Sequence, residues 1–307
     1  MPKTDAAEAL AALRAGLPVE RARRALAGLM RAANPDTPAL DARLLVQAAT
    51  GLSHAAIIAE ADRPLTAEQA ARLRAFARRR LAGEPVSRIL GRREFFGRVF
   101  EITPHVLDPR PETELLVEAA LRLRPHVERL HATPPVACDL GAGSGAIIVS
   151  LLAEWPGLHG LALDISPPAL RVARRNAVRH GVARRLLCVR GDWLEPVGGP
   201  LNLMLANPPY IPQTDIAALR REVREHDPHL ALSGGADGLM AYRAIARRAR
   251  AVLRPGGWLL TEVGAGQAKA VRELFLRAGL TAEETVLPSI LPDLAGIGRV
   301  VALKANN

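Results

Sequence analysis

The spacing of apolar residues divides the chain into three stretches, and the first, residues 1–85, has helical spacing throughout. Thr37-Pro38 is typical of a helix start, with a capping residue before a proline, and Gly51 is typical of that helix's end. Thr66 and Gln69 have the spacing of a capping box and predict the start of another helix. Apolar side chains recur every three or four residues, for example at Leu40, Leu44, Leu45, Ala48, Leu73 and Phe76. We expect a small helical bundle over residues 1–85.

The second stretch, residues 86–108, follows a different pattern. Within it, residues 94–102 have the composition of two short strands that turn at Gly97. We expect a β-hairpin here, which acts as a linker between the bundle and the rest of the chain.

In the third stretch, residues 109–307, segments with strand and helix patterns alternate. Helices are expected over 167–180, after the start signal Ser166-Pro167, and over 238–253. The predicted strands are 136–140, 160–165, 186–190, 201–206, 258–263 and 299–303. This alternation predicts an α/β fold with a mostly parallel, doubly wound sheet that binds ligands at the carboxyl ends of its strands.

Composition narrows the class of protein. With 49% hydrophobic and 23% charged residues among 307, the chain is neither disordered nor fibrous. Two cysteines are too few for a disulfide framework or a Cys-rich zinc site, and no apolar run approaches the ~18–20 residues of a membrane span. The first residues also lack the apolar core of a signal peptide. We expect a soluble, cytoplasmic protein with no membrane contact.

The net charge of +10 favours an anionic partner, but it has a second explanation. The chain is rich in both arginine and alanine, a pair of biases that also follows from genomic base composition. Five Phe, three Trp and two Tyr leave little material for stacking on nucleotide bases. Nucleic acid is therefore not expected as the direct substrate.

A glycine-rich turn follows the strand predicted over 136–140. It begins at Asp139-Leu140 and continues as Gly141, Ala142, Gly143, Ser144 and Gly145, directly before an apolar helix. Glycines let the backbone approach a ligand closely, and a helix N-terminus offers free N–H groups. A purely structural turn remains an alternative for this motif taken alone.

Acidic and aromatic residues follow the next two predicted strands. Asp164, expected to be an exposed acid at a strand end, has the position from which a carboxylate binds a ribose diol in nucleoside-binding sheets. Asp192 and Trp193 come after the following strand, where a polar side chain can bond an adenine amino group while an indole packs on the purine. The alternatives are a helix cap for Asp164 and ordinary core packing for Trp193.

The most specific motif is Asn207-Pro208-Pro209-Tyr210, after the strand predicted over 201–206. Two consecutive prolines hold the chain extended and remove two N–H donors. The carbonyl groups of Asn207 and Pro208 and the side-chain oxygen of Asn207 are then available as acceptors, and Tyr210 can lie against a flat group. The arrangement suits a planar –NH2 whose two hydrogens are held while its lone pair faces an electrophile.

Together these motifs resemble those of S-adenosylmethionine-dependent methyltransferases that modify planar nitrogens, and most closely the release-factor glutamine methyltransferases, the HemK/PrmC family. The resemblance covers nearly the whole chain, including segments 83–86, 91–97, 109–114, 207–212, 226–232 and 235–239. It implies a Rossmann-like, seven-stranded methyltransferase sheet, with S-adenosyl-L-methionine as cofactor, S-adenosyl-L-homocysteine as product and no metal.

The resemblance also implies a substrate and residue roles. The substrate is the glutamine of the Gly-Gly-Gln motif of peptide chain release factors, which the N-terminal bundle recognises. The implied catalytic residues are Asn207, Pro208 and Tyr210, and Pro209 joins them in binding the substrate. The implied cofactor-binding residues are Gly141, Ala142, Gly143, Ser144, Gly145, Asp164, Asp192, Trp193 and Asn207.

Several points stay open on sequence alone. The same motif serves an adenine –NH2 in DNA or RNA or the glutamine of a ribosomal protein, and an inactive methyltransferase-like binding module is a further alternative. Arg88 stands where the family has an aromatic residue, and Asp108 where it has an aliphatic one. The sequence does not show whether Phe100 and Arg110 help to close the site.

Overall fold

The computed structural model describes residues 3–33, 36–130 and 133–306, and the chain divides into two compact units. The first comprises Met1–Gly91 together with Arg221–His226, and the second comprises Arg92–Arg220 together with Asp227–Asn307. The stretch predicted as a linker, 86–108, is thus divided between them. The short segment 221–226 belongs to the first unit although the chain on both sides of it belongs to the second.

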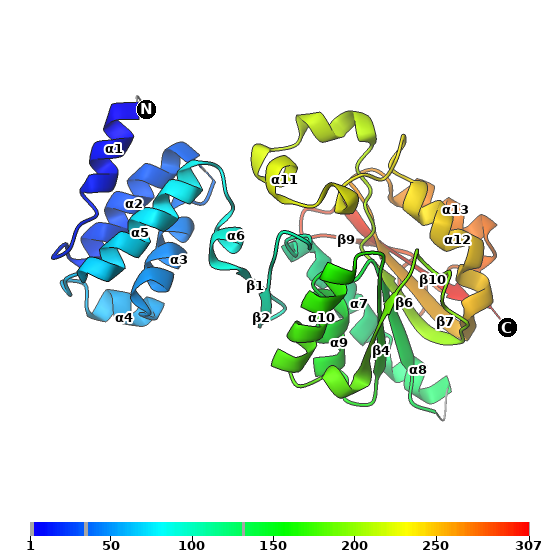
Figure 1. Cartoon of the computed structure of the whole chain (residues 1–307). Coiled ribbons are helices and arrows are strands. Elements are labelled where there is room, and N and C mark those ends of the chain that lie inside the picture. Colours follow the sequence, from blue (N-terminus) through cyan, green and yellow to red (C-terminus); the bar gives the residue numbers. More distant parts are fainter. Residues whose placement is uncertain (1–2, 34–35, 131–132, 307) are drawn as a thin grey trace. The chain divides into compact units, whose positions relative to one another are not determined.

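The first unit is a helical bundle; its part before residue 91 is drawn in blue to cyan in Figure 1 and its segment 221–226 in yellow, and it confirms the helices expected over residues 1–85. Its helices are α1 (Lys3–Ala11), α2 (Val19–Ala33), α3 (Pro38–Thr50), α4 (His54–Ala59), α5 (Ala67–Leu81), α6 (Val86–Leu90) and α11 (Arg221–His226). The inward faces of the helices before residue 91 form one apolar core, which includes the buried side chains of Leu26, Met30, Leu45, Ile57 and Leu73.

The helix ends in this unit follow the local signals with one exception. The capping box before α5 is complete, because the Gln69 backbone N–H donates to Thr66 Oγ1 over 3.1 Å and Thr66 N–H donates to Gln69 Oε1 over 3.0 Å. Gly51 ends α3 with a left-handed φ of 77°. The capping role expected for Thr37 is wrong: it occupies the N-cap position, but its backbone lies outside the extended region and its side chain makes no capping hydrogen bond.

A buried arginine ties α11 to the bundle. Arg80 on α5 is only 2% exposed; its Nε donates to Asp41 on α3 over 2.7 Å, and its Nη2 donates to Glu222 on α11 over 2.6 Å. Burial alone would lower the pKa of Arg80, but the larger opposite effect of the two carboxylates raises it above its ordinary value, so the guanidinium stays charged. A buried charge is stable only when it is paired in this way.

The second unit has the predicted α/β architecture. Seven strands follow one another in the order β5-β4-β3-β6-β7-β10-β8, and β9, paired with β10, adds an eighth. Strands β3 to β7 pair in parallel, and β10 runs antiparallel to its neighbours. The strands are β3 (Val136–Leu140), β4 (His159–Asp164), β5 (Leu186–Arg190), β6 (Leu201–Ala206), β7 (Leu253–Glu262), β8 (Leu280–Thr281), β9 (Ile290–Pro292) and β10 (Gly298–Ala305). All six predicted strands are present, whereas β8 and β9 were not expected.

Helices cover both faces of this sheet (Figure 1). Alternate residues of each strand face opposite ways: Leu203 and Leu205 of β6 pack with the helices of one face, and Met204 and Ala206 with those of the other. The first face carries α7 (Glu114–Arg122), α8 (Arg124–Leu130), α9 (Ala146–Glu154) and α10 (Pro167–Arg179), and the second carries α12 (Met240–Val252) and α13 (Ala268–Arg277). Four 3-10 turns complete the unit: η1 (Pro111–Thr113), η2 (Ala183–Arg185), η3 (Gln213–Ala218) and η4 (His229–Ala231). None of the described helices is long and apolar enough to cross a membrane.

The predicted hairpin is present as β1 (Arg92–Phe95) and β2 (Arg98–Glu101). Its two turn residues, Phe96 and Gly97, have positive φ values of 51° and 69°, as a two-residue hairpin turn requires. Phe100 is fully buried in the core of the second unit, with its ring 5.0 Å from that of His180. Phe100 is therefore a packing residue and not part of a pocket wall.

Candidate active site

The four sequence motifs meet at one edge of the sheet. Residues 141–145, 164, 192–193 and 207–210 lie at or directly after the carboxyl ends of β3, β4, β5 and β6, which are neighbours in the sheet. Because these strands are parallel, their carboxyl ends share one edge, where ligands bind in sheets of this kind.

The glycine-rich turn needs its glycines for conformation and for space. Gly141, Gly143 and Gly145 have φ values of 71°, 54° and 76°, which side-chain-bearing residues rarely adopt. A Cβ on Gly145 would lie 3.0 Å from the Cβ of Ala173, so this glycine also lets α10 pack closely. The carbonyl of buried Ser144 accepts a hydrogen bond from Asn176 over 2.9 Å, which fixes the turn. Ala142, between Gly141 and Gly143, is buried and 8% exposed.

The expectation that Asp164 is an exposed acid is wrong, because its side chain is buried and only 9% exposed. Its Oδ2 accepts from Gly143 N–H over 2.9 Å and its Oδ1 from Ser166 N–H over 2.8 Å, so it joins the glycine turn to the start of α10. Burial raises its pKa, although these N–H donors oppose that rise. Each carboxylate oxygen has a second lone pair, which can accept a ribose hydroxyl.

A second carboxyl lies beneath the turn. Asp139 is 0% exposed, and burial raises its pKa to about 7. Its Oδ2 accepts from Ile148 N–H over 3.3 Å, while its Oδ1 has no hydrogen-bond partner in the part of the chain that the structure describes. The sequence drew attention to Asp139 only as the start of the motif.

Trp193 brings the third motif against the first. A Cβ on Gly141 would lie 4.0 Å from its ring carbon Cζ3. Trp193 has a φ of 46°, an uncommon value for a bulky residue, so the backbone after β5 holds the indole in a strained position. Asp192 beside it is exposed.

The backbone of Asn207-Pro208-Pro209-Tyr210 is held from outside the motif. Pro208 is buried, and the other three residues are half-buried. The Tyr210 carbonyl accepts from Gln267 Nε2 over 3.0 Å, and a Cβ on Gly238 would lie only 2.4 Å from that oxygen. Pro209 is equally confined, because a Cβ on Gly234 would lie 2.8 Å from its carbonyl oxygen. The motif is thus packed against two glycines that no larger residue could replace.

Two buried residues that sequence reasoning missed complete this end of the site. Asn207 Nδ2 donates to Thr113 Oγ1 over 3.0 Å. Glu262, the last residue of β7, is 3% exposed; burial raises its pKa to about 7, and the nearby Thr113 hydroxyl partly opposes that rise. The Oε2 of Glu262 has no hydrogen-bond partner among the described residues. The available signal was a glutamate shortly after the apolar residues Trp258, Leu259 and Leu260 in the predicted strand.

Charged residues surround the tyrosine of the motif. Burial and the Glu262 carboxyl raise the pKa of Tyr210 to about 12, so its hydroxyl stays protonated at neutral pH. Arg110, whose role the sequence left open, donates to Asp227 over 2.5 Å and partly offsets that rise. Asp108 is buried and lies 3.9 Å from Arg93. Within the described residues, no group of three or more His, Cys, Asp or Glu is placed to hold a metal ion.

Comparison with known proteins adds two family matches. A model described as the PrmC N-terminal domain matches residues 21–91, and a model described as the methyltransferase small domain matches residues 123–236.

Three relatives share the same name, release factor glutamine methyltransferase. The protein of Bradyrhizobium diazoefficiens is 46% identical over 289 residues, covering 94% of this chain and 95% of its own. That of Cereibacter sphaeroides is 48% identical over 282 residues, covering 92% and 96%. That of Caulobacter vibrioides is 42% identical over 273 residues, covering 89% and 91%.

Among solved structures, the catalytic domain of human METTL16 in complex with an RNA hairpin has a TM-score of 0.50. It is 16% identical, and the match covers 69% of this chain and 77% of that one. This likeness shows a shared fold and nothing more.

Proposed function

Because the chain belongs to the family of release factor glutamine methyltransferases, we propose that it methylates the amide nitrogen N5 of the glutamine in the Gly-Gly-Gln motif of peptide chain release factors. The observation that carries the proposal is the position of Asn207-Pro208-Pro209-Tyr210 beside the glycine-rich turn, at adjoining strand ends of one sheet. A substrate that acts on the ribosome places the reaction in the cytoplasm.

The residues at the sheet edge fit S-adenosylmethionine as methyl donor. This cofactor carries a ribose diol, an adenine and a cationic amino-acid group. Asp164 has lone pairs left for the diol, and Trp193 and exposed Asp192 border the position proposed for the adenine. The unpartnered Oδ1 of buried Asp139 supplies an acceptor suited to a cationic group. When bound, S-adenosylmethionine supplies an electrophilic methyl group.

The chain's own residues then act on the glutamine by position. An amide nitrogen is a poor nucleophile because its lone pair is delocalised into the carbonyl group. Asn207 Oδ1 and the carbonyl of Pro208 would accept its two hydrogens, which favours a pyramidal nitrogen and directs its lone pair at the methyl group. Preorganised acceptors of this kind contribute several kcal/mol to lowering a barrier, on the order of 3 kcal/mol each.

No strong base is needed in this mechanism. The pKa of Tyr210, raised to about 12, keeps its hydroxyl neutral, so the ring serves to pack against the amide plane. The nitrogen becomes acidic only after the methyl group has arrived, and it then loses its proton to water. Pro209 keeps the segment extended so that the acceptors face the substrate.

The helical bundle would recognise the release factor, as the resemblance implies. A short loop carrying one glutamine buries less than the ~1,200 Å² of a typical specific complex, so further contact surface is needed to distinguish it from other glutamines. The match of residues 21–91 to the PrmC N-terminal domain supports this division of roles.

A methyl-transfer assay tests the proposal. Purified release factor, the same factor with the Gly-Gly-Gln glutamine replaced by asparagine, a ribosomal protein and double-stranded DNA are incubated side by side with labelled S-adenosylmethionine. We expect label only in the unmodified release factor, on the glutamine side chain by tandem mass spectrometry. Label in the DNA or the ribosomal protein and none in the release factor would overturn the assignment.

A further inference from the structure

The mechanism requires that the Oδ1 end of the Asn207 amide faces the substrate. The residues of the motif alone do not determine which end of the amide does so. A side-chain amide has one accepting end and one donating end, and only Oδ1 can hold a hydrogen of the glutamine. Asn207 contacts the hydroxyl of Thr113, which can both donate and accept. With that hydroxyl alone, either end of the amide could face the substrate.

Glu262 removes this ambiguity. An ionised carboxylate attracts hydrogens and cannot donate one, so the Glu262 carboxylate orients the single hydrogen of the nearby Thr113 hydroxyl toward itself. The lone pairs of Thr113 Oγ1 are then left for Asn207 Nδ2, which donates over 3.0 Å. Asn207 Oδ1 is consequently the end that stays available for the substrate.

We propose that Thr113 and Glu262 are positioning residues, which together determine that the accepting end of the Asn207 amide faces the glutamine. This inference rests on the proposed function and extends it to residues outside the catalytic motif. Both residues are 3% exposed, so water does not compete with the contacts of the Thr113 hydroxyl.

Ionisation of Glu262 sets the pH range of this arrangement. Burial and the charge of Glu112 raise its pKa, the Thr113 hydroxyl, Arg299 and Arg110 lower it, and the result is about 7. Tyr210 and Tyr242 also lie within electrostatic reach, but both remain neutral because their pKa values are raised. Below this pKa, Glu262 carries its own O–H and can donate it to Thr113. The Thr113 hydroxyl is then free to donate to Asn207, and the orientation of the Asn207 amide is no longer determined. The turnover number should therefore fall as pH decreases through about 7.

Three variants test the positioning role with a Gly-Gly-Gln peptide at saturating S-adenosylmethionine. Thr113→Val keeps the shape but not the hydroxyl, and we expect kcat to fall about tenfold to hundredfold with cofactor affinity unchanged. Thr113→Ser restores the hydroxyl and should keep kcat within about threefold of wild type. Glu262→Gln should have a lower kcat and lose the acid limb of the pH profile.

The outcomes separate this inference from the proposed function. Absence of methylation of the release factor by the wild-type enzyme would contradict the proposed function. A wild-type enzyme that methylates it, with a Thr113→Val variant of equal kcat or a Glu262→Gln variant that keeps the acid limb, would overturn the positioning role alone. Thermal unfolding and calorimetric cofactor binding check each fold, and if Thr113→Val does not fold, the Thr113→Ser and Glu262→Gln pH profiles decide.

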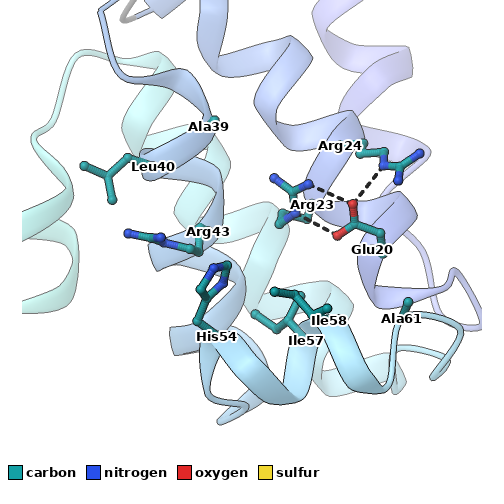
Figure 2. Close-up of a pocket in the computed structure, with 10 residues that line it drawn as sticks. All are labelled: Glu20, Arg23, Arg24, Ala39, Leu40, Arg43, His54, Ile57, Ile58 and Ala61. Carbon is teal, nitrogen blue, oxygen red and sulfur yellow. Dashed lines mark hydrogen bonds and ion pairs between the residues drawn. The ribbon is translucent and has the colours of Figure 1, made fainter.

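A different observation, on the helical bundle, supports a second inference. Helices α2, α3 and α4 surround a hollow of about 660 Å³ (Figure 2), within the usual range for ligand pockets. Its apolar part includes Leu40 and Ile58, which are 39% and 65% exposed. The lining residues are Glu20, Arg23, Arg24, Ala39, Leu40, Arg43, His54, Ile57, Ile58 and Ala61.

Positive charge exceeds negative charge in this hollow. Arg23 and Arg24 both pair with Glu20, at 2.7 and 2.8 Å, and Arg23 above all lowers the pKa of Glu20 to about 2. Among the described residues, Arg43 pairs with no carboxylate, and its buried Nε has no hydrogen-bond partner. A buried donor left without a partner is costly, so an incoming acceptor is favoured there.

We infer that this hollow binds a segment of the release factor in which a carboxylate stands beside an aliphatic side chain. Arg43 would pair with the carboxylate, and Leu40 and Ile58 would cover the aliphatic group. The residues that line the hollow include no Phe, Trp or Tyr and only one imidazole, that of His54, which disfavours nucleic acid bases because these bind by stacking on aromatic side chains. This inference also rests on the proposed function.

Charge reversal tests the hollow against a matched control. We expect Arg43→Glu to raise KM for the full-length release factor about tenfold, with kinetics on the short peptide unchanged. Ile58→Glu, at an exposed position, should act in the same direction. Arg21→Glu makes the same charge change at an exposed site of α2 outside the hollow and should have no such effect.

Each further result has a defined meaning. Unchanged KM in both hollow variants, or an equal loss on the peptide, would overturn the docking role. Loss of binding to a fluorescent oligonucleotide in Arg43→Glu, with release-factor kinetics intact, would assign the hollow to nucleic acid and overturn the inference.

Discussion

Asn207 and Thr113 are 94 residues apart in the chain, yet the side-chain amide of Asn207 donates to the Thr113 hydroxyl over 3.0 Å. Thr113 belongs to the segment that precedes the first strand of the parallel sheet, and Asn207 follows the fourth. The motif Asn207-Pro208-Pro209-Tyr210 is thus held in part by a segment of the chain that comes before all the parallel strands.

Replacing Asn207 by alanine should reduce methyl transfer at least about hundredfold, because it removes Oδ1, the side-chain acceptor proposed for one hydrogen of the glutamine amide. The fold should stay intact, since the side chain is only half-buried and the backbone of the motif is held by Gln267 and the neighbouring glycines. The measurement is turnover beside a thermal unfolding curve. Activity within about tenfold of wild type would contradict the assigned role.

Replacing Asp164 by asparagine should weaken S-adenosylmethionine binding by about 1.5–3 kcal/mol, the worth of a buried charge-assisted hydrogen bond. Alanine is the poorer test, because Asp164 also accepts from Gly143 and Ser166 and its removal would disturb the turn. Ser166→Ala is the control, since it removes the cap of α10 and should lower stability without changing affinity. Equal cofactor affinity of Asp164→Asn and wild type in calorimetry would refute the ribose contact.

Replacing Arg80 by methionine should destabilise the helical bundle by about 3–5 kcal/mol, because the buried Asp41 carboxylate would lose its ion pair with Arg80. Arg78→Met on the same helix is the control, because Arg78 is exposed. Urea unfolding of both variants measures the difference. An Arg80→Met curve that coincides with that of the control would show that the buried pair contributes nothing.

The Asp139 carboxyl makes stability depend on pH in a direction opposite to that of most acids. Its pKa rises from the ordinary value of 3.8 to about 7 on folding, so the folded protein holds this proton more tightly. The contribution to stability is full below pH 3.8, falls as pH rises to about 7, and is constant above that.

Asp139→Asn removes this dependence. Relative to wild type, the variant should gain about 2–4 kcal/mol of stability between about pH 5 and about pH 8.5, whatever its absolute stability. Urea unfolding at both pH values measures the change, and taking the difference from wild type cancels the similar contribution of Glu262. A stability difference that does not change with pH would show that the Asp139 carboxyl titrates normally.

The sequence was sufficient for features that depend on neighbouring residues. The capping box of Thr66 and Gln69 and the turn at Gly97 were predicted because local backbone preference determines them. The four motifs could be placed at one sheet edge because parallel strands bring their carboxyl ends together.

Features that depend on tertiary packing were beyond such reasoning. Thr37 has the right type and position for a cap, but its backbone angles do not allow the bond. Asp164 was expected to be exposed, and its burial results from the close approach of the glycine turn to α10. Glu262 and Thr113 come near Asn207 only through the folding of segments far apart in sequence, and Phe100 was drawn into the core by the hairpin's packing.

The inclusion of α11 in the helical bundle has a consequence for the order of events during synthesis. Arg80 and Glu222 are 142 residues apart in the chain. The bundle's other helices leave the ribosome first, but the second carboxylate of Arg80 is made only after four strands of the parallel sheet. A nascent chain stopped before residue 221 should therefore contain a bundle in which Arg80 lacks its ion pair with Glu222, and this bundle should be less resistant to proteolysis than the finished one. The N-terminal unit thus comes first in the chain but is completed late, while the second unit is being synthesised.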